Sequence, residues 1–386
     1  MQRSYLCLVS ALVMLGAIYP VGMASAQDED WSGFPTSEWP LAGGHFGQTR
    51  HSALTQITPE NIDQLGGAWV TELGGGEVSR STLVVRNGLM FLNTGQGIRA
   101  LDAATGEEQW RHAAPVGRMN KGVALGAGLV FAGLNDSRLI ALDQQTGALV
   151  WEHLVGVEGQ VGQWISSPST YADGLVIVGM ANGDSYLRGR IVAVDARTGE
   201  RRWLFDVIPE PGTLGADTWP VDSDVWRFGG GGVWMTPTVD VSLGTFYVGT
   251  GNAVPMWGGE LRPGDNLFTS SVVALDLRTG EYKWHQQLVH HDIWDYDINS
   301  APTLMDITVD GEQMCGMNGC GFDWGTCSEG QVCGSESFCV DEATTGSSDG
   351  GGGCTIGAAT TTGGVLFLFA LGLLALIGTR TRRNEI

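Results

Sequence analysis

Short apolar segments alternate with polar turns through the middle of the chain, and one pattern occurs four times. The four copies begin at Ala100, Ala141, Ala193 and Ala274 and read ALDAATGEEQW, ALDQQTGALVW, AVDARTGERRW and ALDLRTGEYKW. In each copy an apolar run leads into Asp-x-x-Thr-Gly, and a second run ends in Trp. An Asp at the start of a turn bonds back to the backbone, and Gly supplies the positive φ that follows, so each copy is predicted to be a β-hairpin.

The tryptophan that closes each copy predicts a repeated packing joint between sheets. Successive tryptophans are 41, 52 and 81 residues apart, and further apolar runs lie upstream of each hairpin. About 40–50 residues carrying four strands is the repeat length of a propeller blade. We therefore predict an all-β propeller over residues 27–311, with about five to six blades' worth of sequence and insertions at 209–224 and 254–266. A β-sandwich is the alternative.

Composition excludes two classes of protein. Apolar residues make up 43% of the chain and 14 residues are Trp, which excludes intrinsic disorder for most of it. The chain has 42 acidic and 21 basic side chains, a net charge of −21, and its only lysines are Lys121 and Lys283. Nucleic-acid binding needs a basic face, so no nucleic-acid partner is expected.

The N-terminal end has the pattern of a secretory signal peptide over residues 1–26. Arg3 is followed by an apolar run, and Ala24-Ser25-Ala26 is a small-x-small cleavage site. The mature chain is therefore expected to be exported to the periplasm or cell surface.

The C-terminal end combines a linker, an apolar stretch and an arginine cluster. Residues 346–354 form a Gly/Ser linker that ends in Cys354, and residues 355–386 contain an uncharged stretch followed by three arginines. This pattern predicts a transmembrane helix with a cytoplasmic Arg-rich tail, so the chain would be anchored in the membrane at least transiently. The alternative is a buried C-terminal helix. The whole tail resembles myxobacterial C-terminal sorting signals, which implies processing near Cys354 by a sortase-like enzyme.

Five cysteines lie within the segment 312–345, and they follow a long stretch without cysteine. They are Cys315, Cys320, Cys327, Cys333 and Cys339. In an exported chain such a cluster predicts a small segment held by disulfides, and metal binding by the thiolates is the alternative. The odd number leaves one thiol to pair with Cys354, to pair between molecules or to stay free.

Several oxygen-bearing side chains stand in positions suited to catalysis or to a hard cation. Asn252 ends a Gly-Thr-Gly-Asn segment, and Asp295 and Asp297 alternate on a short extended segment. Trp294 and Tyr296 flank Asp295, and desolvation by such neighbours would raise the proton affinity of a general base. Asn and Asp oxygens suit Ca²⁺ or another hard cation. Zinc at His290-His291 is the alternative, although adjacent side chains on a strand point apart.

The repeat and these motifs resemble the pyrroloquinoline-quinone (PQQ) dehydrogenases, which are eight-bladed propellers that oxidise alcohols or sugars. The resemblance begins at the EWPLAGG motif of residues 38–44, ends near Gly311 and is most specific at HHDIWDYD, residues 290–297. The motif is more similar to the glucose and quinate branch than to the methanol branch. Only the N-terminal part of such a propeller is represented.

The resemblance implies a role for each of six residues. Asp295 would be the catalytic base, and the quinone would be bound by Trp234 and by Lys121, which replaces an Arg of the family. Metal ligands would be Asn252, Asp184 in place of a Glu, and Asp297, as in lanthanide-using relatives. The implied cofactors are PQQ and Ca²⁺, with a lanthanide or Mg²⁺ as the alternative ion.

The implied activity is oxidation of the hydroxyl of a small alcohol or sugar, with hydride transfer to PQQ beside the metal ion. The alternative function belongs to another class: a truncated, non-catalytic propeller displayed on the cell surface as a binding or scaffold module.

Overall fold

The computed structural model describes residues 30–73, 79–117, 119–298 and 300–304 with their side chains, and the backbone of four short strands up to residue 341. The predicted signal peptide, the linker with Cys354 and the predicted helix within 355–386 lie outside these residues, as do the side chains of the cysteine-rich segment. In the described part of the chain, no helix has the length and apolar character needed to cross a membrane.

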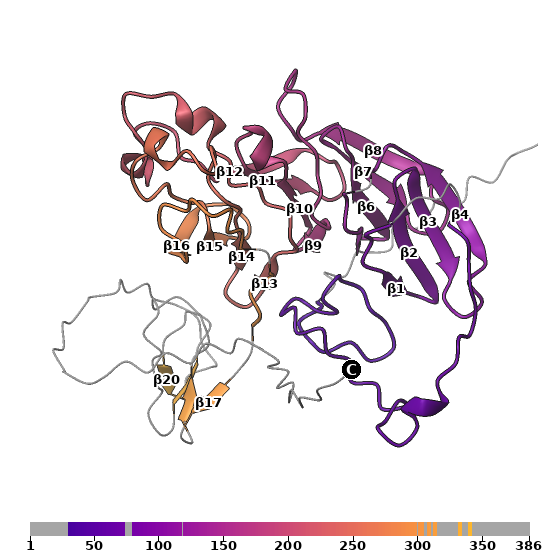
Figure 1. The fold of residues 1–386 in the computed structure, drawn as a ribbon. Helices are drawn as coiled ribbons and strands as arrows, with labels where there is room; N and C mark the ends of the chain where they lie inside the picture. Colours follow the sequence, from indigo (N-terminus) through magenta and orange to yellow (C-terminus); the bar gives the residue numbers. More distant parts are fainter. Residues whose placement is uncertain are drawn as a thin grey trace, which may run out of the picture. The chain divides into compact units, whose positions relative to one another are not determined.

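The four predicted hairpins each belong to a four-stranded antiparallel sheet, in which the strands follow one another in chain order (Figure 1). The first sheet contains β1 (Val84–Arg86), β2 (Leu89–Thr94), β3 (Gly97–Asp102) and β4 (Glu108–Ala113). The second contains β5 (Ala124–Gly126), β6 (Leu129–Gly133), β7 (Arg138–Asp143) and β8 (Leu149–Leu154). The third contains β9 (Thr170–Ala172), β10 (Leu175–Met180), β11 (Arg190–Asp195) and β12 (Arg201–Asp206). The fourth contains β13 (Thr238–Asp240), β14 (Thr245–Gly249), β15 (Ser271–Asp276) and β16 (Tyr282–Gln287).

The Asp-x-x-Thr-Gly turn joins the third and fourth strands of every sheet, as predicted. In the first sheet the Asp102 carboxylate accepts the backbone N–H groups of Ala104 and Thr105, at 2.9 and 2.8 Å. Gly106 then leaves the turn with φ +76°. The other three turns repeat these bonds from Asp143, Asp195 and Asp276. The short polar side chain and the glycine are therefore sufficient to define the hairpin locally.

The closing tryptophans join consecutive sheets, which confirms the predicted packing joint. The indole N–H groups of Trp110, Trp151 and Trp203 donate to turn carbonyls of the next sheet, at 3.0 to 3.1 Å. The turn glycine makes room for the ring: a Cβ added to Gly147 would lie 2.5 Å from Trp110. Trp69, which lies outside the four sequence copies, makes the same bond to Ala103 of the first sheet, at 3.2 Å.

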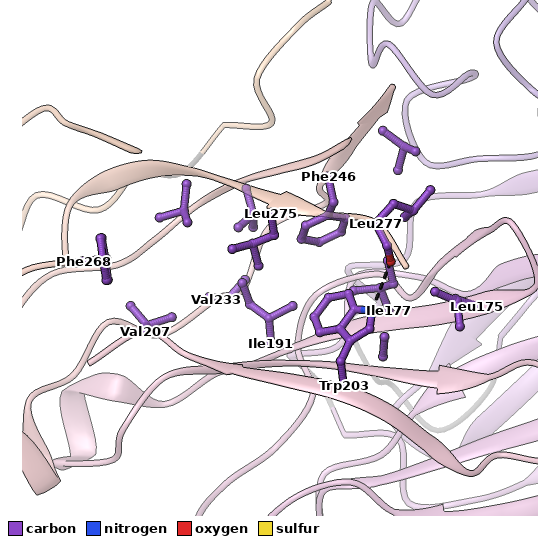
Figure 2. Packing of buried hydrophobic residues seen from close by; sticks show 14 of the residues in the cluster. Leu175, Ile177, Ile191, Trp203, Val207, Val233, Phe246, Phe268, Leu275 and Leu277 are labelled. Atoms are coloured by element: carbon purple, nitrogen blue, oxygen red, sulfur yellow. Dashed lines mark hydrogen bonds between the residues drawn. The ribbon is translucent and has the colours of Figure 1, made fainter. Parts of the chain in front are cut away.

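The core consists of apolar side chains enclosed between neighbouring sheets. Figure 2 shows Ile177 and Ile191 of the third sheet facing Phe246 and Leu275 of the fourth, with the Trp203 hydrogen bond at the edge of the cluster. Leu, Ile, Val and Phe alternate along these strands with residues that face the other way, so each sheet buries one face against each neighbour.

The described residues form four complete sheets, fewer than the five to six blades' worth that the sequence predicted. Residues 30–73, which that prediction included, form loops with one short 3₁₀ helix, η1 (Ile62–Gln64). After the fourth sheet only the pairs β17 (Ile307–Val309) with β18 (Glu312–Met314) and β19 (Gln331–Cys333) with β20 (Cys339–Asp341) are described. The all-β class is correct, because the described residues contain no α-helix.

Loops and insertions between the strands carry the remaining short helices. They are η2 (Gly183–Ser185), η3 (Ala216–Thr218), η4 (Val225–Phe228) and η5 (Gly259–Leu261). The N-terminal loop packs on the sheets as well: Trp39 bridges to Val85 of β1, and Trp31 contacts all three core clusters. The predicted insertions at 209–224 and 254–266 therefore leave the strand pattern of the third and fourth sheets intact.

Candidate functional site

Five of the six predicted site residues line one cavity of about 260 Å³. Lys121 precedes the second sheet, Asp184 lies between β10 and β11, and Trp234, Asn252 and Asp297 come from loops around the fourth sheet. Arg80, Ser166 and Trp164 also line the cavity, and the sequence had not indicated them. They stand outside any recognisable motif, so only their position in the fold identifies them.

Glycines allow three backbone segments to meet at the floor of the cavity. The Gly231 N–H donates to the Asn252 carbonyl at 2.8 Å, and the Gly251 N–H donates to the Gly232 carbonyl at 2.8 Å. A Cβ on Gly189 would lie only 1.8 Å from the Gly231 oxygen. The run of four glycines before Val233-Trp234 therefore allows close backbone contact, and this contact determines the positions of Trp234 and Asn252.

Asp297 is the central polar group of the cavity. Its Oδ2 accepts the indole N–H of Trp234 at 2.9 Å, and its Oδ1 accepts the backbone N–H of Asn252 at 2.8 Å. Desolvation raises the pKa of Asp297, the two hydrogen bonds oppose the shift, and the carboxylates of Asp184 and Asp295 add to it. The orientation of the Trp234 ring is thus fixed by Asp297.

Lys121 lies over the face of the Trp234 ring. Its Nζ is 4.7 Å from the ring centroid and donates to the Ser166 hydroxyl at 3.0 Å. Desolvation, followed by the nearby Arg80 cation, lowers the pKa of Lys121 to about 8, against the opposing effect of Asp297. An aromatic ring beside a partly desolvated ammonium suits a planar anionic ligand.

The donor set for a cation consists of oxygen atoms. Asp184 lies in η2, between two residues with left-handed backbone, and its charge raises the pKa values of both Asp295 and Asp297. Asn252 is buried and adjoins Asp297. Carboxylates that repel one another, next to an amide oxygen, match what a hard cation prefers. The residues present therefore fit such an ion.

No three His, Cys, Asp or Glu side chains converge on a metal position within the described residues. A cation in the cavity would therefore take Asn252 and atoms of a bound ligand in addition to the carboxylates. The zinc alternative at His290-His291 gains no support either. His291 bonds through Nδ1 to the Gly264 carbonyl at 2.8 Å, and His290 lies 3.7 Å from Asp265.

Asp295 does not line the cavity with the other five residues. It is exposed, and its backbone has φ +69°. Trp294 and Tyr296 are 58% and 57% exposed, so they flank Asp295 without enclosing it. Partial desolvation nevertheless raises the pKa of Asp295, followed by the carboxylates of Asp184 and Asp292. Charge repulsion from neighbouring carboxylates thus adds to the proton affinity of Asp295, which the sequence predicted from desolvation by aromatic neighbours.

Comparison with known families gives one match over most of the chain. Residues 39–317 match the family described as "PQQ: Glucose/ethanol/alcohol dehydrogenase, beta-propeller domain". The quinohemoprotein alcohol dehydrogenase of Comamonas testosteroni is 38% identical over 302 residues, which are 72% of this chain and 42% of the relative. Quinohemoprotein alcohol dehydrogenase ADH IIB of Pseudomonas putida is 33% identical over 80% of this chain and 47% of the relative.

Solved structures agree with the sequence comparison. The crystal structure of the Comamonas testosteroni enzyme has a TM-score of 0.68 and 35% identity, over 72% of this chain and 45% of the other. A europium-containing methanol dehydrogenase has a TM-score of 0.65 and 28% identity, over 72% and 54%. The chain thus spans about half the length of these relatives. All of them are alcohol or methanol dehydrogenases, and the closer likeness to the glucose and quinate branch stays a prediction.

Proposed function

Because the chain belongs to the family of PQQ-dependent glucose, ethanol and alcohol dehydrogenases, we propose that it binds PQQ and oxidises the hydroxyl of a small alcohol or sugar. The observation that carries this proposal is the convergence of Lys121, Asp184, Trp234, Asn252 and Asp297 on one cavity. These residues come from loops far apart in the sequence, and their types suit a planar anionic cofactor next to a cation.

Two residues of the cavity would bind the quinone. Trp234 offers a ring whose orientation is held by Asp297, and Lys121 offers an ammonium group above that ring. We propose that the quinone stacks on Trp234 and that Lys121 pairs with one of its carboxylates. When bound, PQQ supplies the acceptor for the hydride that leaves the substrate carbon.

Asp295 is proposed to take the proton of the substrate hydroxyl. Its raised pKa makes it a better proton acceptor than an ordinary aspartate, and its exposed position leaves it open to an incoming alcohol. The carboxylates of Asp184 and Asp292 hold negative charge close to Asp295, which favours the protonated state that follows the transfer.

Asp184, Asn252 and Asp297 are proposed to hold Ca²⁺ or a lanthanide, with Mg²⁺ as the third option. The support is their all-oxygen character and the mutual repulsion of the carboxylates. One structural relative contains europium, so a lanthanide is included in the test. Asp184 has a shorter side chain than the Glu expected at this position. Direct titration of the protein with Ca²⁺, a lanthanide and Mg²⁺ will decide which ion binds.

The assay uses the purified mature protein, loaded with PQQ and with Ca²⁺ or a lanthanide, and follows dye reduction with ethanol and with glucose. Turnover that requires both quinone and metal supports the proposal. Failure to bind quinone at micromolar concentration would refute it and favour the binding or scaffold alternative, for which no specific observation speaks at present.

We also propose that the protein is exported and attached to the membrane or cell surface through its C-terminal region. The support is the sequence of residues 1–26 and of residues 346–386, both outside the described residues. Mass spectrometry of the C-terminus of surface-exposed protein tests processing near Cys354. An intact peptide ending at Ile386 would refute processing, and finding the protein only in the cytoplasm would refute export.

A further inference from the structure

The loop that carries Asp295 is closed by the buried carboxylate of Asp292. Asp292 is 1% exposed, and its two oxygens accept the backbone N–H groups of Trp294 and Tyr296, each at 2.9 Å. Asp295 lies between these two anchored residues in left-handed backbone, with φ +69°. The carboxylate of Asp292 thus holds the turn in which the proposed base sits.

The same loop is tied to the neighbouring insertion by a fully buried arginine. Arg262 is 0% exposed, and its guanidinium donates to four neutral acceptors. These are the carbonyls of Pro255 at 3.0 Å, Met256 at 3.1 Å and Asp292, and the Asn266 amide oxygen at 2.7 Å. Burial removes the hydration of this cation, and the nearby carboxylates of Asp292 and Glu260 offset part of that cost. Arg262 therefore connects the backbone of residues 255–266 to the start of the Asp295 loop.

The far end of the loop is anchored in the cavity. Asp297 accepts the N–H groups of Trp234 and Asn252, so the backbone on both sides of Asp295 is restrained. No hydrogen bond to the Asp295 carboxylate itself is found among the described residues. The position of this carboxylate is therefore set by its backbone rather than by a partner of its own.

We propose that Arg262 and Asp292 are positioning residues that set the place of Asp295 for proton abstraction. The inference rests on the proposed function, because it assumes that Asp295 is the base. A planar guanidinium has five N–H donors in fixed directions and can donate to carbonyls on two loops at once, whereas a lysine ammonium has three rotatable donors at one atom. A misplacement of the reacting group by about 1 Å costs roughly 100-fold in rate, so restraint of the loop has a kinetic consequence.

The test compares Asp292→Asn and Arg262→Lys with the full-length wild-type protein. Asp265→Asn is the matched control, because Asp265 lies in the same insertion and its exposed carboxylate faces His290 rather than a residue of the 292–298 loop. Three properties are measured for each protein: kcat with dye, quinone affinity by quenching of tryptophan fluorescence, and amide exchange of the peptide 292–298 by mass spectrometry.

We expect Asp292→Asn, which keeps only one acceptor oxygen, to lose the protection of at least one of the two amides in this peptide, to bind quinone like the wild type, and to lose about 100-fold in kcat. Arg262→Lys should show the same pattern, although it keeps the positive charge. The control should match the wild type in all three properties. An unchanged kcat in a variant whose loop has lost protection would overturn the inference, as would failure of both variants to fold.

Failure of the proposed function is distinguishable from failure of this inference. If the wild-type protein binds quinone but shows no turnover, the proposed activity is wrong. Amide exchange still tests whether Arg262 and Asp292 restrain the Asp295 loop. Loss of protection confined to peptide 292–298 supports a local restraint of the loop. Loss that spreads through the fourth sheet shows a general structural role and overturns the inference.

Discussion

Replacement of Lys121 should change how quinone binding depends on pH. Its Nζ lies above Trp234 and bonds to Ser166, and burial together with Arg80 lowers its pKa to about 8. The side chain is therefore a cation below pH 8 and neutral above it. The carboxylates of the quinone stay ionised in this range, because ordinary carboxyl groups titrate near pH 4. Affinity should then be constant below pH 8 and fall above it.

The size of the effect follows from the bond that is lost. A hydrogen bond to a charged group contributes about 1.5–3 kcal/mol, and about 1.4 kcal/mol corresponds to a factor of ten in affinity. We therefore expect the dissociation constant of the wild type to rise by about 10- to 100-fold between pH 7 and pH 10. Lys121→Met should show the weak affinity at every pH. Lys121→Arg should bind equally at every pH, since arginine stays charged.

The assay is equilibrium quenching of tryptophan fluorescence by PQQ from pH 6.5 to 10, at a fixed Ca²⁺ concentration. Lys283→Met is the matched control, because Lys283 is the other lysine of the chain and bonds to the Leu243 and Gly244 carbonyls instead. A wild-type affinity that stays constant up to pH 10 would refute the reasoning. The same conclusion follows if Lys283→Met abolishes the pH dependence.

Three further perturbations test the sheet joint, the glycine contact and the metal site. Trp203→Phe keeps an aromatic ring but loses the hydrogen bond to the next sheet and part of the buried ring system, so urea denaturation should show a loss of at least about 0.5–1.5 kcal/mol; no loss would exclude the joint as a source of stability. Gly189→Ala places a Cβ 1.8 Å from a backbone oxygen and should weaken quinone binding and lower stability by about 1–3 kcal/mol or more. Gly67→Ala, with open space around it, is the neutral control in the same thermal melts. Asp297→Asn should reduce Tb³⁺ affinity, followed by sensitised luminescence, by at least about 10- to 100-fold. Because the pKa of Asp297 is raised, the wild type should lose Tb³⁺ on acidification at a higher pH than a site with an ordinary aspartate would. Equal Tb³⁺ affinity of the wild type and Asp297→Asn would exclude Asp297 as a metal ligand.

Local structure and the family were predictable from the sequence, because they depend on short-range pattern. An aspartate, a threonine and a glycine at fixed offsets close a turn by bonds within five residues, as Asp102 does. The tryptophan at a constant position after the turn meets the same surface of the next sheet each time, so its repetition predicts the joint. Five of the six residues that the sequence proposed for the site also lie at one cavity.

Only the tertiary structure decided how those residues combine. The bond from Asp297 to Trp234 joins residues 63 positions apart, and Asp184 acts on both other carboxylates from a different sheet. The exposure of Asp295, the burial of Arg262 and the number of complete sheets depend on which loops pack against one another. A repeat pattern determines the blade and its joint through local bonds, whereas distances across the cavity result from loops of irregular length, whose paths no periodicity describes.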